Sequence, residues 1–199
     1  MVAGGSGTRF GKPKQYEPLG DRRVLDWSLE VAREISDVVV LVVPSGRVDD
    51  VEPLADVVVA GGDSRSASVR AGLAAVSDAA TVVLVHDAAR PVPLVDVWER
   101  VVAALESGAS AVVPVVPVTD TLRERDGGTV DRTRLVAVQT PQGFAADVLR
   151  AAHASGADAS DDAALAEAVG ANVVLVDGDV RNIKITNASD LALAELLVR

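Results

Sequence analysis

The sequence predicts an α/β fold, a three-layer sandwich with a mostly parallel central sheet and one protruding β-arm. Three observations carry this prediction. Short Val-rich runs recur along the chain, segments of helical periodicity lie between them, and one polar stretch at 120–138 interrupts the alternation. Strands that alternate with helices of this length are typical of βαβ units. With 199 residues, the chain is long enough for one domain over 1–199.

The predicted strands are continuous apolar runs rather than alternating ones. Such runs suit strands that are buried on both faces, as in a parallel sheet. A further strand is expected to be short, because only Met1–Ala3 precede the first glycine-rich loop. The other runs are Val38–Val43, Val57–Val59, Thr81–Val85, Ala111–Val118 and Val173–Val176.

The predicted helices have apolar residues that return every three or four positions. The clearest examples run from Val24 to Ile35 and from Val95 to Leu105. Further helices are expected over Ser66–Val76, Ala145–Ala154, Asp161–Val169 and Asp190–Val198. In the segment 120–138, two runs flank the turn residues Asp126–Gly128, which predicts a β-hairpin. Because this hairpin is polar, it has few apolar side chains to bury by itself. We therefore expect it to form an arm that reaches over a pocket or a neighbouring subunit.

Composition excludes several classes of function. The formal net charge is −10, which argues against binding to nucleic acid or to an anionic membrane surface. The chain has no Cys, so disulfides, a thiol nucleophile and thiolate metal sites are excluded. No apolar run reaches the roughly 18 residues of a membrane span, and no secretory signal is recognisable. We therefore expect a cytoplasmic protein.

The first candidate site is the glycine-rich loop at Ala3–Gly7. Its glycines permit positive φ and let backbone N–H groups approach an anion closely. Three cations follow at once, Arg9, Lys12 and Lys14, in a chain that is otherwise acidic. This combination indicates a polyphosphate ligand. A solvated basic turn is the simpler alternative.

The second candidate site follows the strand that ends at Val85. It places Asp87 and Arg90 at the carboxyl end of a strand, which is where open α/β sheets bind their ligands. A carboxylate there can hold Mg²⁺ or accept a hydrogen bond from a sugar hydroxyl, and Arg90 can meet a substrate phosphate. A structural ion pair is the alternative reading.

Two other strings are weaker candidates. In Gly61–Ser68, the glycines and polar groups at a helix start could hold a base and a ribose, and Asp63 or Ser64 could also cap the helix. Lys184 is predicted in a short strand, on the face opposite Ile183 and Ile185, where it lines a pocket or reaches solvent.

The remaining polar and aromatic residues have simpler interpretations. His86 and His153 lack metal-ligand spacing, and His153 is expected on a helix surface. Trp27 and Trp98 lie on apolar helix stripes and are expected in the core. The acidic run 158–162 is interpreted as a helix start, capped by Ser160 or Asp161.

Taken together, the strings resemble one known family. AGGSGTRFGKPKQY, GGDSRSASVRAGL, VHDAARP, PVTDTL, VDRTRL with QTPQGF, SDDAALAE and NIKIT occur in the order found in the 2-C-methyl-D-erythritol 4-phosphate cytidylyltransferases. The resemblance covers essentially the whole chain. It implies a Rossmann-like nucleotidyltransferase fold. It also implies a reaction, dependent on Mg²⁺, in which CTP and methylerythritol phosphate give CDP-methylerythritol and pyrophosphate.

The resemblance also implies roles for individual residues. Arg9 and Lys14 would stabilise the charge on the α-phosphate and the leaving pyrophosphate, whereas Arg132 and Lys184 would position the attacking phosphate. Asp87 would contact the nucleotide or the metal as well as the methylerythritol. Residues that would line the second substrate are Arg90, Thr121 and Ser160. Residues that would hold CTP are Ala3, Gly4, Gly5, Ser6, Gly7, Gly62, Asp63, Ser68, Asp87 and Ala88.

The resemblance further implies a homodimer that is joined through the 120–138 arm. Three departures from the family pattern stand out, besides the short first strand. The loop between Arg9 and Lys14 is shorter than in many relatives, Ser160 stands where Thr is usual, and Arg123 where Lys is common. Two alternatives stay open, a ribitol-5-phosphate cytidylyltransferase and an inactive nucleotide-binding relative.

Overall fold

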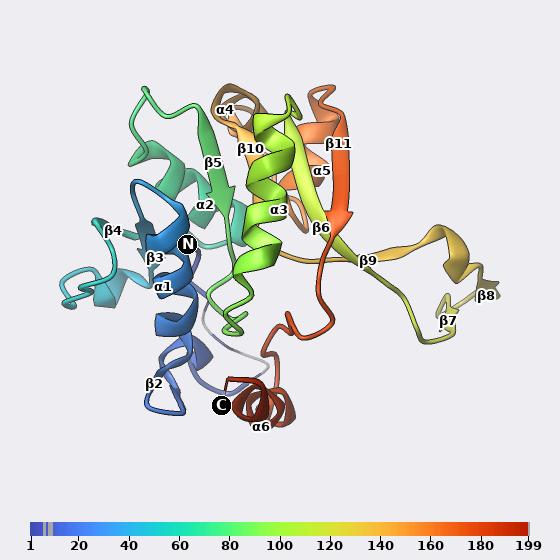
Figure 1. The fold of residues 1–199 in the computed structure, drawn as a ribbon, viewed down its shortest axis with the longest axis horizontal. Coiled ribbons are helices and arrows are strands. Elements are labelled where there is room, and N and C mark those ends of the chain that lie inside the picture. Colours follow the sequence, from blue (N-terminus) through green and yellow to red (C-terminus); the bar gives the residue numbers. More distant parts are fainter. Residues whose placement is uncertain (6, 8–9, 199) are drawn as a thin grey trace.

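The computed structural model of the chain describes residues 1–5, 7 and 10–198. Figure 1 shows a central sheet with helices packed on both of its faces, and an arm that leaves the sheet on one side. The three-layer α/β sandwich with a β-arm is thereby confirmed.

The sheet is built from two groups of strands. In the first group, β3 (Val40–Val43) pairs in parallel with β4 (Val57–Ala60). The second group has the order β11 (Val173–Asp177), β6 (Ala111–Pro117), β10 (Gln142–Ala145) and β5 (Val82–Val85). Strand β11 is parallel to β6, whereas β10 is antiparallel to both β6 and β5. Strands β5, β6 and β11 therefore share one direction, as a mostly parallel sheet requires, and β10 is the reversed strand between them.

Met1–Ala3 join the two groups. Val2 forms parallel bridges to Val42, at the end of β3, and to Asp87, just beyond β5. The Ala3 N–H donates to the Val42 carbonyl at 2.7 Å, and the Ala88 N–H donates to the Val2 carbonyl at 3.0 Å. The short first strand thus lies between β3 and β5, and it delivers the glycine-rich loop to the carboxyl ends of the parallel strands.

Six helices lie close to their predicted ranges among the described residues: α1 (Val24–Ile35), α2 (Arg65–Ala74), α3 (Val95–Glu106), α4 (Ala146–His153), α5 (Asp162–Ala168) and α6 (Ala188–Leu197). One core cluster packs residues of α1 and α3 against Leu41 and Val43. Another packs residues of α2, α4 and α5 against Val85 and Phe144. Side-chain caps start three of the helices: Ser64 for α2, Asp161 for α5 and Asn187 for α6. No helix in the described part of the chain is long and apolar enough to cross a membrane.

The arm contains the predicted hairpin. Its strands β7 (Leu122–Arg123) and β8 (Thr129–Val130) pair in antiparallel fashion. A 3₁₀ helix, η3 (Arg132–Arg134), follows, and β9 (Val136–Val138) then returns along β6. Figure 1 shows β7 and β8 at the far end of the arm, well away from the central sheet.

Two local predictions were wrong. His153 is buried rather than on a helix surface, because its Nε2 lies 2.9 Å from Asp162 Oδ1 at the junction of α4 and α5. Lys184 lies in an irregular segment rather than in a strand. There the Ile185 N–H donates to the Ala89 carbonyl, in the loop after β5, and no ladder forms. The two tryptophans agree better with expectation, since Trp98 is buried and Trp27 is half-buried in a core cluster.

Candidate active site

Several of the predicted site residues lie where the parallel strands end. The glycine-rich loop follows Ala3, the pair Gly61–Gly62 follows β4, and Asp87 follows β5. The carboxyl edge of such a sheet is the usual ligand site of an open α/β fold. Ser6 and Arg9, which belong to the predicted site, lie outside the described residues.

The glycine-rich loop is held by a buried side chain that the sequence interpretation missed. Gln15 Nε2 donates to the Ala3 carbonyl at 2.5 Å and to the Gly5 carbonyl at 3.0 Å. Gln15 lies in η1 (Lys14–Tyr16), so the same short helix positions Lys14 beside the loop. Gly7 has φ +69°, and a Cβ there would overlap the Lys12 carbonyl. Glycine is therefore required at this point of the loop.

Ser68 brings the second glycine pair against the first loop. Its hydroxyl accepts from the Gly62 N–H at 3.2 Å and donates to the Gly62 carbonyl at 3.3 Å. A Cβ on Gly4 would lie 3.2 Å from the same oxygen. Asp63 is exposed at this turn, and the capping role falls to Ser64. The turn thus leaves the Asp63 carboxylate facing solvent beside the glycine-rich loop.

Asp87 is the centre of a charged cluster. Its Oδ2 accepts from Lys184 Nζ at 2.6 Å, and its Oδ1 accepts from Arg65 Nε at 3.2 Å. Burial opposes ionisation of Asp87, but Arg65 and Lys184 outweigh it and hold the pKa of the carboxyl group well below its usual range. Asp87 is therefore ionised at neutral pH, with a cation on each oxygen.

Arg65 is a second residue that the sequence interpretation missed. Besides Asp87, it binds Asp162, whose Oδ2 lies 2.7 Å from Arg65 Nη1. Asp162 is fully buried and also meets His153. Arg65 stands inside the GGDSR string, so the only signal in the sequence was a cation at a predicted helix start.

Two other predicted site residues already form hydrogen bonds within the fold. Ala88 is fully buried, and its N–H bonds to Val2. Arg90 donates to the Asn182 carbonyl at 2.5 Å and to the Val138 carbonyl at 3.3 Å. Burial lowers the pKa of Arg90. Arg90 thus ties the Lys184 segment and β9 to the end of β5.

The residues predicted for the second substrate are not all brought together within one chain. Ser160 is exposed next to Asp161, in a segment that bonds to α2 through Ser64 and Asp158. Thr121 and Arg132 lie on the arm, and Arg132 donates to the carbonyls of Val118 and Thr119. Figure 1 shows that the arm, which carries both residues, extends away from the central sheet.

Glycine loops and cations at the edge of a parallel sheet bind phosphates. The described residues provide no group of three His, Asp or Glu side chains that could hold a metal by themselves. Mg²⁺ commonly uses one or two protein carboxylates and completes its shell with substrate phosphates and water. Asp87 is one buried carboxylate near the glycine-rich loop, and each of its oxygens has a lone pair besides the one that accepts from Lys184 or Arg65, so a single protein ligand is compatible with that pattern. A glycine-rich loop, cations and one buried carboxylate at this edge form an arrangement that suits a nucleotide-binding α/β protein.

Comparison with known proteins identifies the family. The IspD family model, 2-C-methyl-D-erythritol 4-phosphate cytidylyltransferase, matches residues 1–199. The chain belongs to this family. A member from Nocardia farcinica is 43% identical over 212 residues, which cover all of this chain and 92% of the relative. The crystal structure of the Thermus thermophilus member superposes with a TM-score of 0.89 at 40% identity and covers 100% of this chain and 97% of its own.

Some relatives are longer. The bifunctional enzyme IspD/IspF of Dinoroseobacter shibae is 43% identical over 215 residues, and this chain spans 53% of its length.

Proposed function

We propose that this chain transfers CMP from CTP to 2-C-methyl-D-erythritol 4-phosphate, by in-line attack of the substrate phosphate on the CTP α-phosphate. A P–O bond forms between the two phosphates, and the bond to the leaving pyrophosphate breaks. Family membership supports the reaction and favours methylerythritol phosphate over ribitol 5-phosphate. The observation that carries the proposal is the gathering of both glycine turns and the Asp87–Lys184 pair at one sheet edge.

We propose that catalysis in this site is positioning and electrostatics. The attacking phosphate oxygen is already ionised at neutral pH, so the reaction needs no general base, and the described site indeed centres on cations. Lys14 and Arg9 would offset charge on the α-phosphate and the pyrophosphate, and Lys184 would hold the attacking phosphate. Mg²⁺, with Asp87 as its protein ligand, would neutralise triphosphate charge.

The nucleotide end would be held by the two glycine turns. Ala3, Gly4, Gly5, Ser6 and Gly7 would follow the ribose and the triphosphate, and Gly62, Asp63 and Ser68 would hold the cytidine. Ser68 bonds to Gly62, and its hydroxyl leaves no room for a side chain at Gly4, so it would set the distance between the base end and the phosphate end. Ala88 would contribute through its backbone position, since its side chain is buried.

The second-substrate end would be completed by the arm of another copy, in a homodimer. Thr121 and Arg132 belong to the arm, which extends away from the central sheet (Figure 1), whereas Arg90 bonds to Asn182 and Ser160 lies next to the start of α5. The arm also exposes apolar side chains, with Val136 45% and Val138 43% exposed, which a partner would cover. Two-fold symmetry would place each arm over the site of the other chain.

Pyrophosphate release tests the proposal. The assay contains CTP, Mg²⁺ and either methylerythritol phosphate or ribitol 5-phosphate. We expect turnover with methylerythritol phosphate and none with ribitol phosphate. A preference for ribitol phosphate would overturn the substrate assignment and keep the mechanism. No turnover with either, in protein that still binds CTP, would assign an inactive nucleotide-binding relative.

A further inference from the structure

The segment that carries Lys184 has no strand partner, and side-chain amides hold it instead. Residues 178–187 lie between β11 and α6, and none of them belongs to a strand. Two buried amides, Gln139 with 5% and Asn182 with 3% of its surface exposed, stand between this segment and the chain that follows β9. A buried amide needs hydrogen-bond partners, because its polar atoms are removed from water. The partners of these two amides therefore show which parts of the chain they join.

Gln139 pairs with the backbone of Asp179 as a strand residue would. Its Nε2 donates to the Asp179 carbonyl at 2.8 Å, and its Oε1 accepts from the Asp179 N–H at 3.1 Å. The exchange of both bonds with one residue is the pattern of a hydrogen-bonded pair in an antiparallel ladder. A Cβ on Gly178 would overlap Gln139 Oε1, so the approach is close. One side chain thus takes the place of a strand at the start of the segment.

Asn182 joins the same two stretches of backbone from the other side. Its Nδ2 donates to the Thr140 carbonyl at 2.9 Å and to Gln139 Oε1 at 3.4 Å. Arg90 completes the contact, because its Nη1 donates to the Asn182 carbonyl at 2.5 Å and its Nη2 to the Val138 carbonyl at 3.3 Å. Gln139 and Asn182 therefore form an amide pair, bonded to each other and to both backbones.

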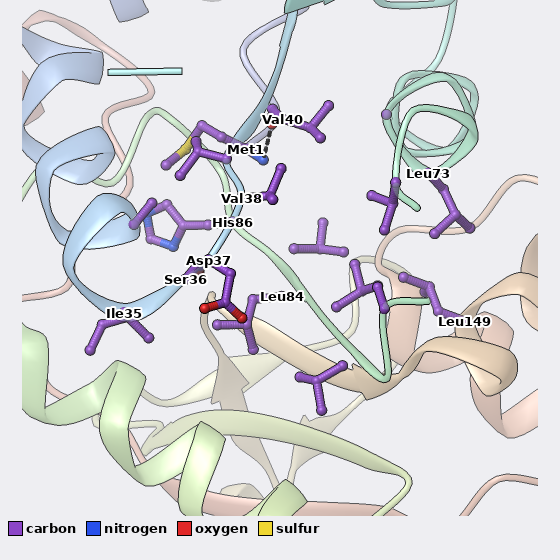
Figure 2. Close-up of a pocket in the computed structure, with 18 of the residues that line it drawn as sticks. Met1, Ile35, Ser36, Asp37, Val38, Val40, Leu73, Leu84, His86 and Leu149 are labelled. Carbon is purple, nitrogen blue, oxygen red and sulfur yellow. Dashed lines mark hydrogen bonds between the residues drawn. The ribbon is translucent and has the colours of Figure 1, made fainter. Parts of the chain in front are cut away.

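Thr140 connects the amide pair to Asp87. Its carbonyl accepts from Asn182, and its hydroxyl oxygen accepts from the Asp87 N–H at 3.1 Å. The hydroxyl proton goes to Nδ1 of His86, 3.1 Å away, since the other ring nitrogen faces the Arg90 carbonyl and must donate. Figure 2 shows His86 on the wall of a cavity in the core. Thr140 thus fixes the irregular segment relative to the backbone of Asp87 from a buried position.

Lys184 follows Asn182 by two residues and is held between two buried anchors. The first anchor is the amide pair. The second is Ile185, which is fully buried and whose N–H donates to the Ala89 carbonyl at 2.8 Å. The Lys184 side chain is itself 37% exposed, and a long exposed side chain has many rotamers to lose. A backbone fixed on both sides therefore directs the ammonium group to the sheet edge, where it meets Asp87.

We propose that Gln139 and Asn182 are positioning residues for the second substrate, because the amide pair sets the place from which Lys184 reaches the attacking phosphate. This role rests on the proposed function, in which Lys184 holds that phosphate. Both amides act through Lys184 rather than by contact with the reacting atoms. A displacement of about 1 Å at a positioned group can cost about 100-fold in rate, so a pair that lies behind the site has a large kinetic effect.

The test replaces each amide by an apolar side chain of similar size. In Gln139→Met we expect kcat/KM for methylerythritol phosphate to fall roughly 10- to 100-fold, whereas the Kd for CTP stays at its wild-type value. Asn182→Leu is expected to have the same effect from the other side of the pair. Val101→Ala is the matched control, since Val101 is a fully buried residue of α3 and its truncation lowers stability away from the segment. Equal losses of kcat/KM in the control and in the amide variants would overturn the proposal.

A double-mutant cycle with Lys184→Ala shows whether the amide pair acts through the lysine. We expect Gln139→Met to reduce kcat/KM much less in the Lys184→Ala background than in the wild-type chain. The same loss in both backgrounds would overturn the proposal. A loss of CTP affinity as large as the loss of kcat/KM would overturn it too, because the effect would then not be confined to the second substrate.

Amide exchange at Ile185 separates the anchoring role from the proposed reaction, because it needs no substrate. We expect the Ile185 N–H to exchange faster in Gln139→Met and in Asn182→Leu than in Val101→Ala or in the wild-type chain. Exchange at Ile185 that is no faster in the amide variants than in the control would overturn the anchoring role. If the wild-type chain turns over neither phosphate, the proposed function fails, and faster exchange in the amide variants still supports the anchoring of the segment.

Discussion

Lys184 Nζ lies 2.6 Å from Asp87 Oδ2, although 97 positions separate the two residues in the sequence. The pair joins the end of β5 to the irregular segment before α6. Arg65 holds the other oxygen of the same carboxylate. Asp87 therefore fixes two cations at the sheet edge where the glycine-rich loop emerges.

Replacement of Lys184 by Ala is expected to lower kcat about 100- to 1000-fold, because one preorganised positive charge is lost from the transfer. The measurement is pyrophosphate release at saturating CTP. The matched control is Arg181→Ala, since Arg181 is an exposed cation on the same segment and pairs with Asp179. Equal losses in the two variants would contradict a direct role for Lys184.

Mixing two inactive variants is expected to restore activity if the arm completes the site of another copy. Arg132→Ala removes the arm contribution, and Lys184→Ala removes the body contribution. A mixed dimer then has one site with both residues intact, so random mixing should recover about a quarter of wild-type activity. The assay is turnover before and after co-refolding of the two variants. No recovery, with mixed dimers demonstrated by mass, would show that Arg132 serves its own chain.

The Gly7→Ala variant is expected to weaken CTP binding about tenfold or more, a loss of about 1.4 kcal/mol. Its Cβ would overlap the Lys12 carbonyl and displace the loop. Gly11→Ala is the matched control, because Gly11 also has positive φ (+88°) but nothing lies within 4 Å of its Cβ position. Binding is measured by titration calorimetry. If both variants bind CTP equally weakly, backbone strain rather than loop displacement is the cause.

Stability is expected to rise with pH between about 6 and 8. Burial lowers the pKa of the Met1 amino group from 8.0 to about 6, against a smaller opposing effect of Asp87. Between these values the unfolded chain binds more protons than the folded chain, so the free energy of unfolding increases with pH, by about 3 kcal/mol in total.

The same pH series needs a control for His86. Burial lowers the pKa of His86 from 6.5 to about 3, so the folded state loses stability from this residue only as the pH falls below 6.5. Most of the range from pH 6 to 8 lies above that value. Acetylation of Met1 removes the titrating amine and should flatten the rise in Tm from pH 6.5 to 8. A rise that persists after acetylation would assign the effect to another group.

Sequence periodicity predicted the strands and helices well, because apolar runs and amphipathic stripes are local signals. It missed β10, whose residues Gln142–Ala145 form no Val-rich run and include a glycine packed against α3. It also placed Lys184 in a strand, since alternation around Ile183 and Ile185 looks the same whether or not a partner strand exists.

The site was predicted less completely than the fold. The motifs located both glycine turns and Asp87, but Gln15 and Arg65 act through contacts that the sequence does not show. Gln15 reaches back to the Ala3 and Gly5 carbonyls, and Arg65 reaches two carboxylates from distant segments. The burial of His153 was missed for the same reason, because its partner Asp162 lies on the next helix. Such pairings depend on tertiary packing.

The bridging position of Met1–Ala3 has a consequence for how nucleotide binding couples to folding. The backbone of these residues is the ladder connection between the β3–β4 part, which carries the Gly61–Gly62 turn, and the β5–β11 part, which carries Asp87. A nucleotide that touches both glycine turns and Asp87 would link the two strand groups non-covalently, in addition to the backbone bridges of Met1–Ala3. Its binding energy then adds to the cohesion of the sheet itself. Under the proposed function, CTP is therefore expected to stabilise the two strand groups together, and not only the residues that it touches.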